Sequence, residues 1–560
     1  MGGNMMLEPQ SRLLKAALLA FALTSAGALA DPSDGGLDYD PAREALAGAL
    51  LSPAVQATKD VVAFYRERGF EALWTGADAS SEERLRALAA SLGRAADHGL
   101  PVERFDPRQL RGLLAGARDA EARAQAELAV SQIYLDYARA LDVGIVDPRA
   151  VDEAMKRKVH ARSDADLLTV IAEVAPASAM RSLAPRSAEY AQLMRQKDRL
   201  ERVVRSGGWG ASVSSATLRP GDDGAGVVEL RDRLMAMGYL GRRLSTSYDS
   251  AVSDAVARFQ EAVGLEVDGI AGPDTIAALN VSAEDRLGSV LVAMERERWL
   301  DDGRDEGRVI VVNLPEFAAR VFDDGREVFQ TRAVVGAVED GKPTPEFSDE
   351  MTHLVVNPSW YVPPGIIRRD YLPKLQANPW ALSKYEILDR KGRPANRAAG
   401  FRQYSASSFP FSIRQEPGPD NALGLVKFMF PNPWSIYLHD TPAKNLFDRD
   451  RRAYSSGCVR LADPFGLARL LLSPQDDDAD AAIRSILDTG RERRVDLADA
   501  VPVHLIYRTA FIGPKGGLHF REDIYGRDAK VLAALLRAGA GGRQDRLAEA
   551  DALVREGGAG

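Results

Sequence analysis

The chain of 560 residues carries a formal net charge of −8, and 45% of its residues are hydrophobic. This composition is typical of a globular protein with several domains, and the acidic balance argues against nucleic acid as a partner. The six histidines and the single cysteine show no metal-ligand spacing. We therefore expect no metal site and no other cofactor. A single cysteine also excludes an intramolecular disulfide.

The first 30 residues have the layout of a secretory signal peptide. Arg12 and Lys15 supply a positive start, residues 16–28 form a short apolar run, and residues 28–30 (ALA) offer a cleavage site. The run is too short to span a bilayer comfortably, since a spanning helix needs roughly 20 apolar residues. We therefore expect residues 1–30 to direct export, with an uncleaved anchor as the alternative.

Residues 31–215 begin with a loose lead-in rich in Asp and Gly and then follow a helical pattern. The sequence offers a capping box from Ser80 to Glu83, followed by Leu85 and Leu88 at helical spacing. Strand-like alternation is scarce, and no motif carries chemistry. The pattern predicts a helical scaffold domain over this range.

Residues 216–282 predict a compact module of three short helices. Gly238 is placed to end the first helix, and Pro273 to open the third. The stretches LRPGDDGAGVVELRDRL and AVARFQEAVGLEVDGIAGPDTIAAL resemble the peptidoglycan-binding domain type 1 family. The resemblance implies a wall-binding module, with a three-helix spacer that binds nothing as the alternative.

After an expected linker helix at 283–307, the hydrophobic period changes to two over residues 308–510. Segments such as RVIVVN, REVFQTRAVVG, LVVNPSWYVP and VPVHLIYRT are typical of strands. Residues 375–425 interrupt them with polar sequence rich in Gly, Pro and Asn, which indicates either a lid or a passive loop. Residues 511–560 form an expected C-terminal extension. The fold class is therefore multidomain α+β, with a helical scaffold, a three-helix module and a β-rich, sandwich-like domain that carries an inserted cap.

The single cysteine, Cys458, lies in AYSSGCVRL after Gly457, which permits a tight turn able to direct backbone N–H groups at one point. In WSIYLHD, Tyr437 and His439 share one face of an expected strand, and His439 lies nineteen residues before Cys458. A thiol needs a base to become a nucleophile, and a nearby histidine can supply it. The alternatives are His353 or His504 as the base, and a thiol that is only a small buried hydrophobe.

The stretch HDTPAKNLFDRDRRAYSSGCVRLADP resembles the active-site signature of the L,D-transpeptidase catalytic domain of the YkuD type. NPSWYVPPGII upstream and PVHLIYRTAF downstream fit the same family. Over the full chain, the likeness extends to its large periplasmic members, which combine a helical scaffold, a peptidoglycan-binding module and a catalytic domain with an inserted cap.

By that resemblance Cys458 is the nucleophile and His439 the general base. The backbone around Gly457 serves the oxyanion, and Arg460 holds the loop or a substrate carboxylate. Two further residues are expected to support the site, Tyr437 and Ser456. Many family members carry a histidine at the position of Ser456, so its absence here removes one alternative base.

The resemblance implies acyl transfer between peptide stems of the Gram-negative wall. The thiolate attacks the third residue of a tetrapeptide, meso-diaminopimelate, D-alanine leaves, and an amine of a neighbouring stem forms a 3→3 cross-link. The alternatives are an L,D-carboxypeptidase, attachment of an outer-membrane lipoprotein, and a non-catalytic wall-binding scaffold. The expected partners are donor and acceptor stems and other cell-wall enzymes, the expected location is the periplasm, and carbapenems are expected to acylate the thiol.

For the insertion at 375–425 we expect a lid that closes over the stem. Trp380 and Tyr385 would cover apolar surface, and Arg402 and Arg414 would pair with stem carboxylates. Three residues are expected to act as flexible joints: Gly418, Asn421 and Gly424.

Overall fold

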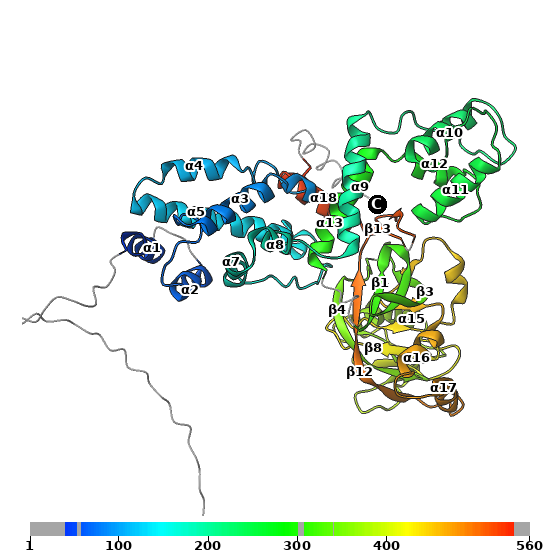
Figure 1. Cartoon of the computed structure of the whole chain (residues 1–560). Helices are drawn as coiled ribbons and strands as arrows, with labels where there is room; N and C mark the ends of the chain where they lie inside the picture. Colours follow the sequence, from blue (N-terminus) through cyan, green and yellow to red (C-terminus); the bar gives the residue numbers. More distant parts are fainter. Residues whose placement is uncertain (1–39, 53–57, 301–306, 340, 514, 542–560) are drawn as a thin grey trace, which may run out of the picture. The chain divides into compact units, whose positions relative to one another are not determined.

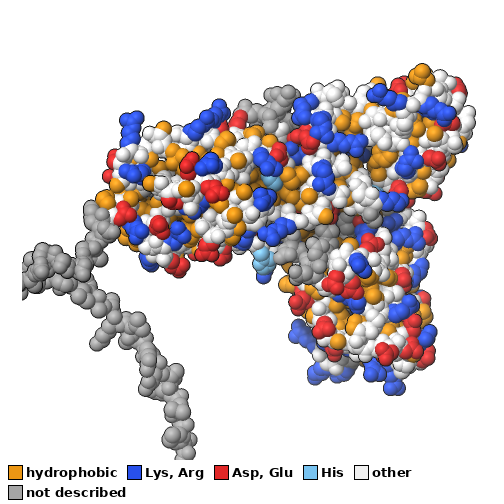
Figure 2. Space-filling view, in the orientation of Figure 1, with side chains coloured by type: hydrophobic (Ala, Val, Ile, Leu, Met, Phe, Trp, Pro, Cys, Tyr) orange, Lys and Arg blue, Asp and Glu red, His pale blue; other side chains and the backbone are white. Residues whose placement is uncertain are grey.

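The computed structural model describes five stretches of the chain, residues 40–52, 58–300, 307–339, 341–513 and 515–541 (Figure 1). The predicted signal peptide lies outside the described residues. Within the described stretches, no helix is both long and apolar enough to cross a membrane. Figure 2 shows basic, acidic and hydrophobic side chains intermixed on the visible face.

The predicted helical scaffold is confirmed (Figure 1). Its helices are α1 (Pro41–Leu51), α2 (Lys59–Glu67), α3 (Ala79–Leu92), α4 (Arg108–Gly116), α5 (Ala120–Asp142), α6 (Pro148–Val151), α7 (Asp164–Glu173), α8 (Pro176–Arg181) and α9 (Ala188–Arg205), with a 3-10 turn η1 (Ala95–His98). The predicted capping box at Ser80 is wrong. Asp78 is the N-cap of α3, because its carboxylate accepts the Ser81 N–H at 3.0 Å.

The small module contains three helices, α10 (Ala225–Met237), α11 (Ser250–Val263) and α12 (Pro273–Asn280), around one hydrophobic core. Gly238 ends α10 with φ of 88°, a left-handed conformation that suits glycine. Pro273 is the first residue of α12, where its missing N–H costs nothing. Both turn signals therefore predict the helix boundaries correctly.

Helix α13 (Ala283–Trp299) follows the module, and every residue from 290 to 299 is buried. The four charged side chains from 295 to 298 are paired. The Arg296 guanidinium lies 2.8 Å from Glu346 and 2.7 Å from Asp528, and Arg527 lies 3.1 Å from Glu346. Asp528 and Arg527 belong to α18 (Arg527–Arg537). Buried charges are tolerated when they are paired in this way, so α13, α18 and the residue before β4 form one interlocked unit.

The β-rich domain is built on a nine-stranded mixed sheet in the order β10-β3-β11-β9-β8-β4-β12-β1-β2. The strands are β1 (Arg308–Asn313), β2 (Ala318–Asp323), β3 (Arg326–Gly336), β4 (Phe347–Val356), β8 (Val426–Met429), β9 (Leu438–His439), β10 (Ala453–Ser455), β11 (Val459–Leu461) and β12 (Arg493–Ile506). Because β2 also pairs with β3, the sheet closes on itself around a single core. Helices α16 (Pro464–Leu472) and α17 (Ala479–Leu487) contribute to that core.

The insertion is more regular than its sequence indicates. It contains a three-stranded sheet in the order β5-β7-β6 and a hydrophobic core of its own. Its elements are β5 (Trp360–Tyr361), α14 (Pro364–Ile366), the π-helical turn η3 (Ile367–Tyr371), α15 (Leu372–Ala377), β6 (Glu386–Leu388), η4 (Arg397–Ala399) and β7 (Ser412–Gln415). Since β5, α14 and α15 join this core, the cap begins before the predicted start at residue 375.

Four short elements complete the described chain: the 3-10 turns η2 (Leu314–Glu316) and η5 (Lys444–Asp448), and the strands β13 (Ala510–Ile512) and β14 (Leu518–Phe520). The hairpin of β13 and β14 contributes to the core that surrounds α13. This part of the expected C-terminal extension is therefore folded together with the linker helix.

Candidate active site

The predicted site residues lie on the outer face of three adjacent strands. In the register of β11, β9 and β8, Arg460 stands opposite His439, and His439 stands opposite Lys427. Residues two apart on a strand share a face, so Cys458 lies on the same face as Arg460, and Tyr437 on the same face as His439. The alternating neighbours Phe428, Leu438 and Val459 fill the core behind them.

The Cys458 thiol is partly exposed and donates to the Ser435 carbonyl, with 3.5 Å between Sγ and the oxygen. Burial of the sulfur raises the pKa of Cys458 to about 11, and the Tyr437 hydroxyl and the Arg460 guanidinium act in the opposite direction. Ser435 has a positive φ of 57°, which is uncommon outside glycine. This strained turn places its carbonyl against the sulfur.

Gly457 supplies the turn before the thiol, with φ of 118°. Its N–H donates to Ser455 Oγ at 3.0 Å, and its carbonyl accepts the Thr344 hydroxyl at 2.8 Å. The Gly457 N–H is therefore already engaged by Ser455. In the described part of the chain the Cys458 N–H donates to no acceptor, so it is the donor available beside the sulfur.

Ser455, which the sequence reasoning missed, holds this turn together. Its hydroxyl donates to the Cys458 carbonyl and accepts the Gly457 N–H. Ser456 is exposed and forms no hydrogen bond within the described stretches, so the structure gives it no supporting contact. A hydroxyl two residues before a glycine is a common turn-forming signal, and it was present in SSGC.

His439 is buried, and its Nδ1 donates to the Asp440 carbonyl. This bond assigns the proton to Nδ1 and leaves Nε2 as the basic nitrogen. Burial lowers the pKa of His439 to about 3, Arg460 lowers it further, and the carbonyls of Asp440 and Leu423 oppose the shift. The imidazole is therefore neutral at physiological pH. Among the described residues, no hydrogen bond joins it to Cys458.

The two alternative bases lie on other strands. His353 lies on β4 and bonds the Thr352 hydroxyl at 2.9 Å, and His504 lies on β12 and bonds Ser348 at 2.7 Å. His439 lies on β9, the strand that pairs directly with β11 after the thiol. The register thus favours His439 over the other two.

The face around the thiol is electropositive. Burial lowers the pKa of the Arg460 guanidinium and of the Lys427 ammonium, while Cys458 and Glu492 oppose these shifts. Neither cation forms an ion pair with any described carboxylate, and Arg460 Nε is buried without an acceptor. Buried cations without counter-charges are costly unless a ligand supplies the anion. Lys427 was missed, although it is the only charged residue in LVKFMF.

The cap reaches this face at two points. Its Leu425 N–H donates to Asp440 at 2.9 Å, and the Trp360 indole lies near the Tyr437 hydroxyl and lowers its pKa, against a larger rise from burial. Among the described residues there is no group of His, Cys, Asp and Glu able to hold a metal ion. The site is therefore a thiol, an imidazole and two cations, partly covered by the cap.

Of the four residues expected to serve the lid, three bond other residues of the cap. Arg414 pairs with Glu386 at 3.2 Å and with Glu416, and Arg402 donates to the Gln376 carbonyl at 3.2 Å, so both are used inside the cap. Tyr385 bonds Tyr371 in the cap core, while Trp380 is 65% exposed. Their charges and rings are thus mostly committed to the fold of the cap.

Two of the three expected joints, Asn421 and Gly424, are packed, whereas a Cβ added to Gly418 would meet no atom within 4 Å. Asn421 is 1% exposed and donates to the carbonyls of Pro358 and Glu416 at 3.0 and 2.9 Å. A Cβ added to Gly424 would lie 2.3 Å from the Asp440 side chain. Gly424 therefore permits the cap to lie close to Asp440, the residue after β9. This connection is a packed contact and not a flexible joint.

The pKa values of the site predict unusual behaviour toward alkylating reagents. Only the thiolate reacts, and a thiol with a pKa of about 11 is protonated at neutral pH. Alkylation of the free protein by iodoacetamide should be slow near neutrality and still rising above pH ~10, whereas an ordinary thiol of pKa ~8.5 levels off earlier. Mass spectrometry measures it directly because Cys458 is the only cysteine. N-acetylcysteine is the control. If the alkylation rate of Cys458 levelled off at the same pH as that of N-acetylcysteine, or at a lower pH, the prediction would be contradicted.

Comparison with known families assigns the domains. Residues 307–488 match the family model described as "L,D-transpeptidase catalytic domain". Residues 59–196 match "Scaffold domain", and residues 223–279 match "Putative peptidoglycan binding domain". The chain therefore contains an L,D-transpeptidase catalytic domain. It joins that domain to a scaffold domain and a peptidoglycan-binding domain in one polypeptide.

One curated protein and two solved structures are also similar to parts of the chain. A protein of Haemophilus influenzae named "Putative L,D-transpeptidase" is 35% identical over 227 residues, which is 40% of this chain and 45% of that relative. The match thus spans less than half of the curated relative. Among solved structures, the L,D-transpeptidase of Xylanimonas cellulosilytica is 17% identical, with 52% of this chain and 98% of that chain covered and a TM-score of 0.16. The L,D-transpeptidase of Stackebrandtia nassauensis is 15% identical, with 53% and 97% covered and a TM-score of 0.21.

Proposed function

We propose that this protein forms 3→3 cross-links between peptide stems of peptidoglycan through an acyl-enzyme on Cys458. The observation that carries the proposal is the single thiol beside a buried, neutral His439, on a face where neither Arg460 nor Lys427 forms an ion pair with a described carboxylate. A thiol and a base on adjacent strands suit nucleophilic acyl transfer.

In the first half-reaction, the Cys458 sulfur attacks the carbonyl carbon of the third residue of a tetrapeptide stem. His439 Nε2 takes the thiol proton, and the Cys458 N–H donates to the developing oxyanion. The bond to D-alanine breaks, its nitrogen receives the proton from the imidazole, and a thioester remains.

In the second half-reaction, the side-chain amine of a second stem attacks the thioester carbonyl. His439 removes a proton from that amine, the carbon–sulfur bond breaks, and the thiol is restored. Because thiol and imidazole are both neutral in the free protein, the proton moves during the attack. This scheme does not depend on a thiolate–imidazolium pair formed in advance.

Arg460 and Lys427 are placed to bind the donor. They flank His439 on neighbouring strands about 5 Å apart. The attacked residue, meso-diaminopimelate, carries one free carboxylate at its D-centre, and the D-alanine that leaves carries another. These two groups would form the ion pairs that the two cations lack. The cap would exclude water from the thioester, which favours an amine acceptor over hydrolysis.

The remaining parts fit a wall enzyme. The module at 216–282 would hold the protein on peptidoglycan, the leader at 1–30 would export it to the periplasm, and other cell-wall enzymes would be its neighbours. Carbapenems would acylate Cys458 as donor mimics.

The test is the product made from purified disaccharide-tetrapeptide. We expect release of D-alanine and a dimer whose fragmentation places the bond between two diaminopimelate residues. Tripeptide without dimer would identify a carboxypeptidase. Transfer only to a lysine of a lipoprotein would identify the attachment reaction, and no D-alanine release at all would leave a binding scaffold.

A further inference from the structure

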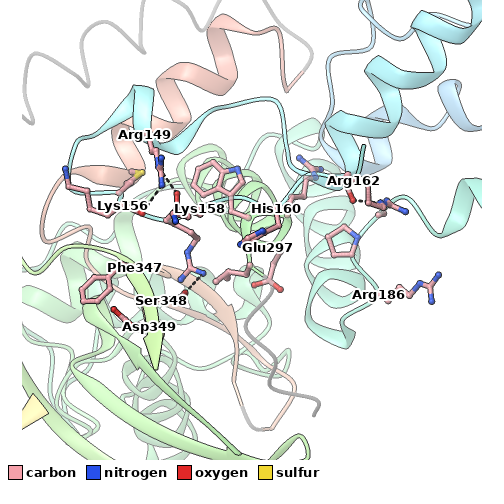
Figure 3. A pocket seen from close by; sticks show the side chains of 18 of the residues that line it. Arg149, Lys156, Lys158, His160, Arg162, Arg186, Glu297, Phe347, Ser348 and Asp349 are labelled. Carbon is pink, nitrogen blue, oxygen red and sulfur yellow. Dashed lines mark hydrogen bonds and ion pairs between the residues drawn. The ribbon is translucent and has the colours of Figure 1, made fainter. Parts of the chain in front are cut away.

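A large cavity lies beside the catalytic domain, apart from the donor face (Figure 3). Its volume is about 1410 Å³, larger than the roughly 300–1,000 Å³ of typical small-molecule sites. It is lined by the segment from Arg149 to Arg162, by the end of α13, by the first residues of β4, and by Pro433 and Trp434. A cavity of this size suits a peptide better than a small metabolite.

The lining is basic. Seven of the described lining residues are Lys or Arg, and four are Asp or Glu. Two of these acids are already neutralised, since Asp142 pairs with Arg162 at 2.7 Å and Glu297 pairs with Arg508 outside the cavity. Three cations have no described carboxylate partner: Lys156, Lys158 and Arg186. Figure 3 labels these three side chains, with Lys156 and Arg186 on opposite sides of the view and Lys158 between them.

The basic segment is attached to the catalytic sheet by its backbone. The Lys156 N–H donates to the Glu346 carbonyl at 2.8 Å, and the Glu346 N–H donates to the Ala154 carbonyl at 2.9 Å. Next to this pairing, Arg157 donates to Ser348 at 3.2 Å. Glu346 also anchors the buried arginines of α13 and α18. The backbone that carries Lys156 and Lys158 is therefore held at a fixed position relative to β4.

The cavity adjoins the turn that contacts the thiol. Trp434 lines the cavity and packs on Phe347, with 4.6 Å between ring centroids. The next residue, Ser435, accepts the Cys458 thiol. Asn432 fixes this turn by donating to the carbonyls of Phe430 and Ile436, both at 2.7 Å. The cavity lining thus includes Trp434, the residue next to the one whose carbonyl contacts the reacting sulfur.

We propose that this cavity binds the acidic peptide of the acceptor stem. The inference rests on the proposed function and adds a second substrate site to it. The donor lies under the cap against Arg460 and Lys427, while carboxylates of the acceptor pair with Lys156, Lys158 and Arg186. Its amine approaches the thioester past Trp434. Separate sites allow the acyl-enzyme to form before the acceptor binds.

The test separates the two half-reactions in the full-length protein. The variant K156Q/K158Q/R186Q should form acyl-enzyme with tetrapeptide at the wild-type rate. Its KM for a soluble tripeptide acceptor should rise about tenfold at low salt, and the salt dependence of cross-linking should weaken, because screened charge pairs have been removed. The matched control is K59Q/R111Q/R118Q, which removes three exposed charges from α2, from α4 and from the connection after α4, all outside the cavity lining.

The outcomes separate this proposal from the proposed function. If the wild-type protein forms no acyl-enzyme, the proposed function fails. If acylation is normal and the triple variant keeps the wild-type acceptor KM, the cavity is not the acceptor site. Loss of binding to intact sacculi with an unchanged soluble-acceptor KM would assign the cavity to a wall polymer, and would also overturn the proposal.

Discussion

Purified Cys458→Ala protein is expected to release no D-alanine, to form no dimer and to gain no mass on exposure to a carbapenem. The sulfur is the only atom on this face able to form the thioester, because the chain has no second cysteine. Loss of the nucleophile removes the covalent route, whereas loss of one helping group only slows it. Mass spectrometry of the protein after incubation with tetrapeptide or carbapenem measures the adduct directly.

The matched control is Ser456→Ala, two residues earlier in the same turn. Ser456 is exposed and makes no hydrogen bond in the part of the chain described, so this variant should retain acylation within about twofold, since surface changes away from partners have small effects. A dimer formed by Cys458→Ala at a rate comparable with wild type would refute the nucleophile assignment.

His439→Ala is expected to acylate about 10²–10⁴-fold more slowly, the range typical of a general base. The deficit should be constant across neutral pH, because burial lowers the pKa of His439 to about 3 and the imidazole is already neutral there. Activity of the wild-type protein should fall only as the pH drops toward that pKa, where the ring takes up a proton and loses its basic nitrogen. Single-turnover acylation measured against pH tests both points.

His353→Ala serves as the control, since His353 lies on β4 and bonds only its neighbour Thr352. Thermal unfolding of each variant shows whether the loss is chemical or structural, because His439 is buried and its removal leaves a cavity. A folded His439→Ala protein that acylates as fast as the His353→Ala control would assign the base elsewhere.

Sequence reasoning found the parts of the site that sit on regular strands. Alternation in WSIYLHD places Tyr437 and His439 on one face, and the register of β9 with β11 has that arrangement. It also found Gly238 and Pro273, because such turn residues act locally. The single thiol was conspicuous from composition alone. These signals all lie within a few residues of the feature they predict.

Long-range contacts explain the failures. The flexible joints expected at Asn421 and Gly424 are fixed by contacts with Pro358 and Asp440. The cap begins with β5, whose sequence continues a strand pattern, because β5 pairs with β7 more than fifty residues later. No local pattern reports such a partner, and turn-like composition is compatible with both a loose loop and a packed core.

The charged cluster around Glu346 sets a practical limit on how the protein can be divided. A fragment cut at residues 307–488 would lack β12, which lies between β4 and β1, and would leave Glu346 without Arg296 and Arg527. Stranding one member of a buried ion pair costs about 3–5 kcal/mol. A fragment that retains the site therefore needs at least α13 to the end of α18. Since Arg508 also pairs with Glu189 of α9 at 2.8 Å, inhibitor screens should use the whole chain.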